Sequence, residues 1–260
     1  MTSKSPVVSV HDPIRIVPLH LDADVLAPVG AAAPAAAPQL TYRNGPLLTA
    51  VEVFTVYWGA AWASAPLADV TTRLDGFFDF VLTSELLDQL AEYSVRGQQI
   101  RHGSRIGRAV VNAPAPERVV ADAAIQHMLQ QELSTNSAFP NAGPNTLLFV
   151  YLPPDTAVVL GGSRSCQAFC GYHNDIGGQI FYAVTPYPGC NGCIGGLAPF
   201  DALTSISSHE LCEAITDPIP GRGWYDDANG EIGDICAWKT RTLGGFTVQL
   251  EWSNNHNTCE

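Results

Sequence analysis

The sequence predicts a fold of the α/β or α+β class, and three observations carry that prediction. Apolar stretches of strand length occur at 51–59, 145–153 and 179–187. Helical patterns of apolar residues lie between the first two stretches and after the third. No internal repeat interrupts this order. Strands that alternate with helices are typical of folds in which helices pack on a sheet.

The predicted strands differ in composition. VEVFTVYWG at 51–59 is β-branched, aromatic and alternating, which predicts a buried strand. NTLLFVYLP at 145–153 is continuously apolar and predicts a central strand. QIFYAVTPY at 179–187 is a further strand, and TAVVL at 156–160 is a shorter candidate.

Prolines and capping residues mark the predicted helices. Pro66 opens one helix, and residues 83–85 start a shorter one that runs to the region of Tyr93. Pro116 opens another helix over ERVVADAAIQHMLQQEL. Before it, the glycines in and next to 98–112 indicate a hairpin or irregular strands.

The first 46 residues differ in composition from the rest. They are rich in Pro and Ala and show no sustained periodicity, so we expect residues 1–46 to form a flexible or loosely docked arm. Residues 47–260 then form a single domain. The first ten residues, MTSKSPVVSV, lack the apolar stretch of a signal peptide.

The overall charge disfavours some classes of function. The net charge is −12 with only 13 Lys and Arg residues, so we expect no nucleic-acid partner. No apolar run approaches the roughly 18 residues of a membrane helix, so we expect no membrane insertion. The surplus carboxylates fit either metal binding or solubility.

Seven cysteines suggest cross-links. Four of them cluster as CQAFC and CNGC, a spacing compatible with disulfides or with a zinc knuckle. Disulfides are favoured, because the first pair is separated by three residues rather than two. The unpaired cysteine is then Cys212, inside a predicted helix. The cysteines expected in disulfides are Cys166, Cys170, Cys190, Cys193, Cys236 and Cys259.

The stretch SSHELCEAITDP, at 207–218, carries the main candidate site. We expect a helix capped by Ser207 or Ser208, with Thr204 as an earlier start. His209 and Glu213 are four residues apart, so they share a helix face at about 5–6 Å between Cβ atoms, a spacing that suits two ligands of one metal. Glu210 is rotated by about 100° around the helix axis from His209, where it can reach a metal-bound water.

A carboxylate at the second ligand position changes the metal chemistry. Carboxylate oxygens bind zinc at about 2.0–2.2 Å. An anionic ligand also makes the bound water less acidic and favours harder ions. We expect Zn²⁺ first, ahead of Ca²⁺ and Mn²⁺. The alternative is an ordinary amphipathic helix that buries Leu211, Ala214 and Ile215 and turns its polar residues outward.

An acidic segment, GWYDDANGEIGDICAW at 223–238, supplies further candidate ligands. Asp234 follows His209 by 25 residues and is the predicted third ligand, with Glu231, 22 residues after His209, in reserve. A solvated acidic turn is the alternative. His173 is either a further ligand or pocket donor, or a hydrogen-bonded structural residue.

Four ordered motifs resemble the exordium / phosphate-induced protein 1 family from about residue 50 onward. They are VYWG, CQAFCGYH, SSHELCEAITDP and WYDD…GEIGDIC. The resemblance implies a zincin-like mixed sheet with a His-Glu helix, and Glu213 at the family's second acidic position. It implies that Cys236 pairs with Cys259 and that the four clustered cysteines pair among themselves. It also implies an extracellular or periplasmic location, like that of secreted cell-wall members.

Two main classes of function follow. A metal-dependent hydrolase of the metallopeptidase type would use Glu210 as the general base, with Tyr225 or His173 stabilising the oxyanion and a peptide as substrate. The rival is a non-catalytic secreted protein that keeps the scaffold and binds a protein or a cell-wall glycan. A carbohydrate-active enzyme that uses Glu210 and a second carboxylate is a third alternative.

Overall fold

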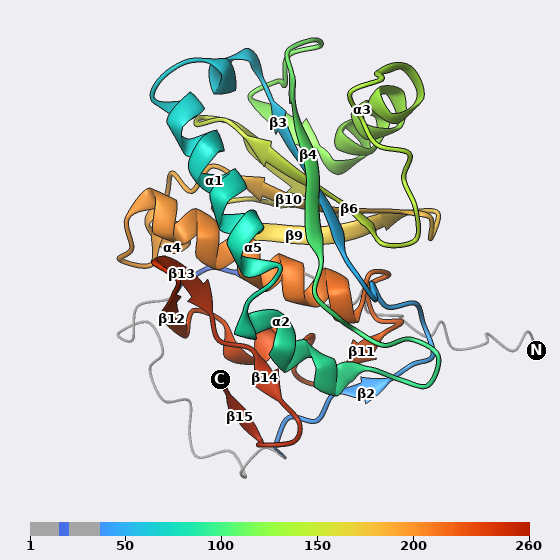
Figure 1. Cartoon of the computed structure of the whole chain (residues 1–260). Helices are drawn as coiled ribbons and strands as arrows, with labels where there is room; N and C mark the ends of the chain where they lie inside the picture. Colours follow the sequence, from blue (N-terminus) through green and yellow to red (C-terminus); the bar gives the residue numbers. More distant parts are fainter. Residues whose placement is uncertain (1–15, 21–36) are drawn as a thin grey trace, which may run out of the picture.

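The computed structural model describes residues 16–20 and 37–260, and these build a mixed α/β fold around a six-stranded sheet (Figure 1). The sheet has the order β1-β9-β10-β6-β3-β4. The strands β4, β3, β6 and β10 run parallel to one another, whereas β9 is antiparallel to β10 and β1 is antiparallel to β9. The strands are β1 (Ile16–Pro18), β3 (Glu52–Trp58), β4 (Ser104–Val111), β6 (Thr146–Leu152), β9 (Phe169–Ile176) and β10 (Ile180–Pro186).

Helices cover both faces of this sheet. Phe149 and Tyr151 of β6 pack in one hydrophobic cluster with α1 (Leu67–Val81), α2 (Glu85–Leu90) and α5 (Pro199–Thr216). The alternate residues Leu148 and Val150 pack in a second cluster with α3 (Asp122–Thr135). A strand with both faces covered needs apolar side chains at every position, which explains the unbroken apolar run of β6.

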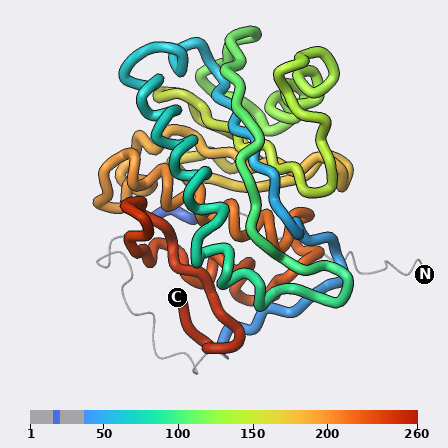
Figure 2. Tube along the Cα trace, viewed as in Figure 1, coloured from blue at the N-terminus to red at the C-terminus, as the bar shows by residue number. Residues whose placement is uncertain are grey.

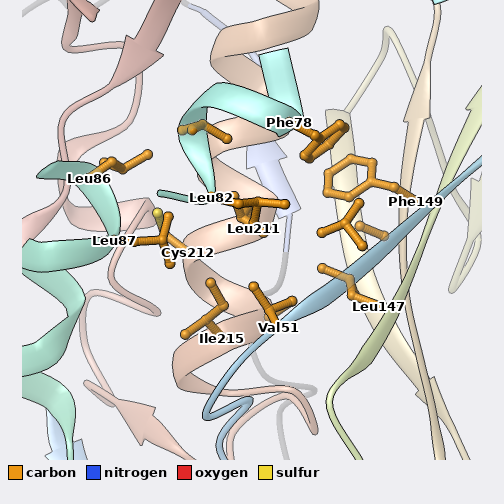
Figure 3. Packing of buried hydrophobic residues seen from close by; sticks show 14 of the residues in the cluster. Val51, Phe78, Leu82, Leu86, Leu87, Leu147, Phe149, Leu211, Cys212 and Ile215 are labelled. Atoms are coloured by element: carbon orange, nitrogen blue, oxygen red, sulfur yellow. The ribbon is translucent and has the colours of Figure 1, made fainter. Parts of the chain in front are cut away.

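The core next to α5 is closely packed. Leu211, Cys212 and Ile215 of α5 lie together with Phe78 and Phe149 (Figure 3). Leu211, Cys212 and Ile215 are each at most 1% exposed. One long side of α5 is therefore anchored mainly by apolar contacts.

Short elements complete the described chain. Figure 2 shows the C-terminal segment beside residues 85–93, and Tyr93 Oη donates a hydrogen bond of 2.6 Å to the Trp252 carbonyl. The short elements are η2 (Ala60–Ala63), η3 (Ala91–Tyr93), α4 (Asn191–Ile194), η4 (Asp234–Cys236), β2 (Thr41–Tyr42), β5 (Val119–Ala121), β7 (Ala157–Leu160), β8 (Ser163–Arg164), β11 (Trp224–Tyr225), β12 (Thr240–Leu243), β13 (Phe246–Gln249), β14 (Trp252–Ser253) and β15 (Thr258–Cys259).

The predicted secondary structure needs correction in three places. The segment 98–112 contains one strand, β4, which pairs in parallel with β3 instead of forming a hairpin. The helix predicted from Pro116 begins at Asp122, because β5 first pairs with β7. The His-Glu helix begins at Pro199 rather than beside Ser207, with proline in the first turn, where its missing N–H costs nothing.

The segment 1–46, predicted as a flexible or loosely docked arm, is described only in part. β1 pairs with β9 at the edge of the main sheet, and β2 pairs with β11. Leu40 is 1% exposed. These parts are docked on the domain, because extended backbone gains hydrogen bonds from strand edges even when its sequence has no apolar period. Residues 1–15 and 21–36 lie outside the described residues.

Three disulfides cross-link the chain. They join Cys166 to Cys190, Cys170 to Cys193 and Cys236 to Cys259, and Cys212 is a buried free thiol. Among the described residues, no helix combines the length and the apolar character that crossing a membrane requires.

Candidate metal centre

Three ionisable side chains of α5 lie on the side opposite Leu211 and are completely buried. His209, Glu210 and Glu213 are each 0% exposed. The structure therefore excludes the ordinary amphipathic helix that would turn these residues to solvent. Buried charges require paired charges, hydrogen bonds or a metal ion, so the surroundings of this face decide its chemistry.

Strand β9 approaches this face of α5 through a glycine. A Cβ atom at Gly171 would lie 2.7 Å from Ile206 Cγ2 and 3.1 Å from Glu210 Oε1, so only glycine allows this separation. His173 follows two residues later and, because side chains alternate along a strand, points to the same side. The close approach brings the imidazole of His173 against the carboxylates of α5.

His209, Glu213 and Asp234 form the first candidate ligand group. His209 Nε2 lies 2.9 Å from Glu213 Oε1 and 4.0 Å from Asp234 Oδ1. Neither ring nitrogen of His209 has a hydrogen-bond partner in the described part of the chain. Two ligands about 2.0–2.2 Å from one tetrahedral zinc ion lie roughly 3.3–3.6 Å apart, between the two distances seen here, so small side-chain shifts would let this group share a cation.

His173 and two carboxylates of α5 form a second group. His173 Nδ1 lies 3.3 Å from Glu210 Oε2 and 3.5 Å from Glu213 Oε2. The other ring nitrogen, Nε2, lies 3.1 Å from the Asp217 carbonyl oxygen and 3.5 Å from Glu231 Oε1. Both groups could hold a metal ion, and Glu213 belongs to both.

The acidic segment after β11 closes the site. The Asp234 N–H donates to Glu213 Oε1 at 3.2 Å, and the Glu231 N–H donates to Asp234 Oδ2 at 3.0 Å. A Cβ atom at Gly233 would lie 2.8 Å from His209 Nδ1. The backbone at Gly233 therefore lies directly against the imidazole, and the Asp234 side chain is only 6% exposed.

Two disulfides fix the segments that carry the outer ligands. Cys170, three residues before His173, is joined to Cys193 in α4. Cys236, two residues after Asp234, is joined to Cys259 near the end of the chain. These cross-links restrict the positions that β9 and the acidic segment can adopt relative to α5.

The pKa shifts show that the cluster attracts positive charge. Burial opposes protonation of His173 and His209, yet the neighbouring carboxylates outweigh it and hold both pKa values well above their usual range. Burial raises the pKa of Glu210 to about 7. For Glu213, burial acts in the same direction, but the charges of the two imidazoles prevail and lower the pKa to about 2.

Two predicted site residues remain, Glu231 and Tyr225, and Glu231 is seen to contact the cluster. Glu231, predicted as a reserve ligand beside Asp234, is fully buried and lies beside His173 rather than His209. Tyr225 lies in β11, with the Arg43 guanidinium 4.5 Å from its ring centroid. These contacts do not test its role in stabilising an oxyanion, which stays a prediction.

Sequence reasoning missed Glu251. This residue is 0% exposed, neither carboxylate oxygen has a hydrogen-bond partner in the described ranges, and burial raises its pKa well above the usual range. It follows β13 in the segment VQLEWS, where alternation with apolar residues is typical of an outward-facing position. No local signal indicates that this carboxylate faces inward.

Comparison with protein-family models and with curated proteins finds no match to this chain. The resemblance to the exordium family and to zincins therefore stays a prediction. The structure itself provides a mixed α/β fold, buried imidazole and carboxylate groups able to hold a metal ion, and three disulfides. Three disulfides fit an extracellular or otherwise oxidising environment.

Proposed function

We propose that this chain is a non-catalytic metalloprotein in which His209, Glu213 and Asp234 hold a divalent cation at a closed site. The complete burial of His209 and Glu213 supports the proposal. A catalytic zinc needs a coordination position that water and substrate can reach, and this burial leaves no such access from solvent. The donor set of one imidazole and two carboxylates fits Zn²⁺, and it also suits Mn²⁺.

The cation would join parts of the chain that are distant in sequence. His209 and Glu213 belong to α5, and Asp234 to the acidic segment that covers them. The metal would offset carboxylate charge and contribute its binding free energy to folding. On this proposal the centre stabilises a secreted scaffold, and the biological ligand is the protein or cell-wall polymer predicted from the sequence.

A metallopeptidase is the second candidate, and one observation favours it. Glu210 follows His209 directly, and its Oε1 atom is buried with no hydrogen-bond partner in the described part of the chain. An unpaired carboxylate oxygen next to a metal ligand is what a general base requires. Catalysis would need the acidic segment around Gly233 to move, because it now covers His209.

A metal-exchange experiment separates the two candidates. The protein is stripped with a chelator, reloaded with Zn²⁺ and followed by thermal unfolding and by cleavage of an unstructured protein substrate. We expect Zn²⁺ to raise the unfolding temperature and no cleavage to occur. Zinc-dependent cleavage that is lost in Glu210→Gln but kept in the exposed control His102→Gln would support the metallopeptidase instead. An unfolding temperature indifferent to Zn²⁺, Mn²⁺ and chelator would overturn the metal centre itself.

A further inference from the structure

We propose that the buried cluster binds two divalent cations, with Glu213 as the carboxylate bridge between them. The inference rests on the proposed function, because the first cation is the one held by His209 and Asp234. The second position is bounded by His173, Glu210 and Glu213, with Glu231 on the far side of the imidazole. Its ligand class is a divalent cation that accepts both imidazole and carboxylate, such as Zn²⁺ or Mn²⁺.

The two oxygens of Glu213 face different imidazoles. Oε1 lies 2.9 Å from His209 Nε2, and Oε2 lies 3.5 Å from His173 Nδ1. Each oxygen therefore belongs to a separate group of ligand atoms. Two-metal sites in proteins place their ions about 3.5–4 Å apart, a separation that one carboxylate can span.

The hydrogen bond on the far side of His173 orients this imidazole as a ligand. A backbone carbonyl only accepts, so Nε2, 3.1 Å from the Asp217 oxygen, carries the ring proton. In the neutral ring, the lone pair of Nδ1 then faces Glu210 Oε2 and Glu213 Oε2. In that neutral form three electron-pair donors converge on one position, which a cation can occupy in place of the proton. Metal-binding histidines commonly donate their other N–H to a carbonyl in this way.

Several carboxylate oxygens at this position are buried without a hydrogen-bond partner. Within the described residues they are Glu210 Oε1, Glu213 Oε2 and both oxygens of Glu231. All three side chains are 0% exposed, so bulk water does not solvate them. An unpaired buried carboxylate is costly, and a cation bound by Glu210 and Glu213 beside His173 Nδ1 would lower this cost.

The charge of the cluster also favours a pair of ions. Glu210, Glu213, Glu231 and Asp234 supply four carboxylates around two imidazoles. One divalent cation offsets the charge of only two of these four carboxylates in a buried site, and a second cation offsets more of the negative charge. Burying uncompensated carboxylate charge is costly, so the carboxylates left over by the first cation favour a second one.

Metal stoichiometry tests the inference. The chelator-stripped protein is titrated with Zn²⁺ by calorimetry, and the metal retained after gel filtration is measured by mass spectrometry. We expect two equivalents per chain. One equivalent would overturn the second site and leave the proposed function intact, whereas none would overturn both.

A matched pair of histidine variants assigns the second cation. His173→Gln should retain one equivalent, and His102→Gln, which changes an exposed histidine paired with Asp88, should retain two. Two equivalents in His173→Gln would contradict the assignment.

A third test uses the wild-type protein loaded with Mn²⁺, so it does not depend on whether a variant folds. Bridged ions couple magnetically, so we expect the resolved hyperfine pattern of isolated Mn²⁺ to be lost from the electron paramagnetic resonance spectrum. Two equivalents of Mn²⁺ that keep the isolated pattern would contradict the bridge through Glu213.

Discussion

Helix α5 is buried on two sides that differ completely in chemistry. On one side, Leu211, Cys212 and Ile215 pack against α1, α2 and the sheet (Figure 3). On the other side, His209 and Glu213 face β9 and the acidic segment that contains Asp234. The residues on both sides are equally hidden from water, so the difference lies in what compensates for the loss of hydration.

The apolar side is stable through its own side chains, whereas the polar side depends on added positive charge. Removing apolar surface from water contributes about 25 cal/mol per Å². Removing carboxylates from water is unfavourable unless a cation or proton accompanies them. Substitutions on the two sides should therefore change the free energy of unfolding by different amounts. Only the effects on the polar side should depend on bound metal.

The largest effect is expected on the apolar side. Leu211→Ala should lower the free energy of unfolding by about 2–5 kcal/mol, because it leaves a cavity beside Ile215 in a closely packed cluster. Denaturant unfolding measures this, and the loss should be equal with Zn²⁺ and with chelator. Leu211→Met, which nearly conserves volume, should cost below about 1.5 kcal/mol. A loss of stability that appears only in the zinc-loaded protein would contradict the prediction that the apolar side of α5 contributes independently of the metal.

Removing the metal is the next largest perturbation and acts on the polar side. At free Zn²⁺ about 100-fold above the dissociation constant, bound metal should add about 2.7 kcal/mol to the free energy of unfolding. Denaturant unfolding at several zinc concentrations measures this increment. It should be absent from Glu213→Gln, which removes a ligand shared by both candidate positions. If Zn²⁺ stabilised Glu213→Gln as much as the wild-type protein, the stabilising zinc ion would not be bound by Glu213 of α5.

The stability of the metal-free protein and the stability increment from Zn²⁺ should change with pH in opposite directions. In the folded metal-free protein, burial raises the pKa of Glu210 from 4.5 to about 7, so the unfolded chain releases this proton first as pH rises. Between these values the metal-free protein should lose up to about 1.4 kcal/mol per pH unit for this group. Zinc ligands must be deprotonated, so the increment from Zn²⁺ should grow over the same range.

Unfolding curves measured from pH 4.5 to about 8, with chelator and with Zn²⁺, check this prediction. The raised pKa values of His173 and His209 act in the same direction, because their stabilising protons are lost as pH rises. A metal-free protein that becomes more stable between about pH 5 and 7 would contradict the predicted loss of stability with rising pH.

The smallest effect is expected at a neighbouring acid outside the cluster. Asp227 has a side chain that is 92% exposed, where it pairs with Arg43. Asp227→Asn should change stability by no more than about 0.5 kcal/mol and leave zinc affinity unchanged. Asp234→Asn in the same segment should weaken zinc binding by about 10-fold or more, measured by competition with a chelating dye. Equal zinc affinities in the two variants would remove Asp234 from the ligand set.

The apolar side of the fold was accessible to sequence reasoning because its signals are local. The unbroken apolar run of β6 and the proline before α1 each predict an element without knowledge of its partners. The pattern His-Glu-x-x-Glu likewise places His209 and Glu213 on one helix face.

The polar side was only partly predictable, because tertiary pairing decides it. β9 contains Gly171, His173 and Asn174, whose sequence gives no apolar alternation, yet the strand is held between β1 and β10. The inward orientation of His173 and Glu251 follows from the packing of whole elements. A polar residue that becomes buried carries no local sign of it, so His173 stayed ambiguous and Glu251 was missed.

Anomalous diffraction from crystals of the zinc-loaded protein, recorded on both sides of the zinc absorption edge, tests the central claim most directly. We expect a peak about 2.0–2.2 Å from His209 Nε2 and from a carboxylate oxygen of Glu213. A map with no peak between these side chains, or with zinc bound only at the protein surface, would show that the buried polar side of α5 is stabilised without a metal ion.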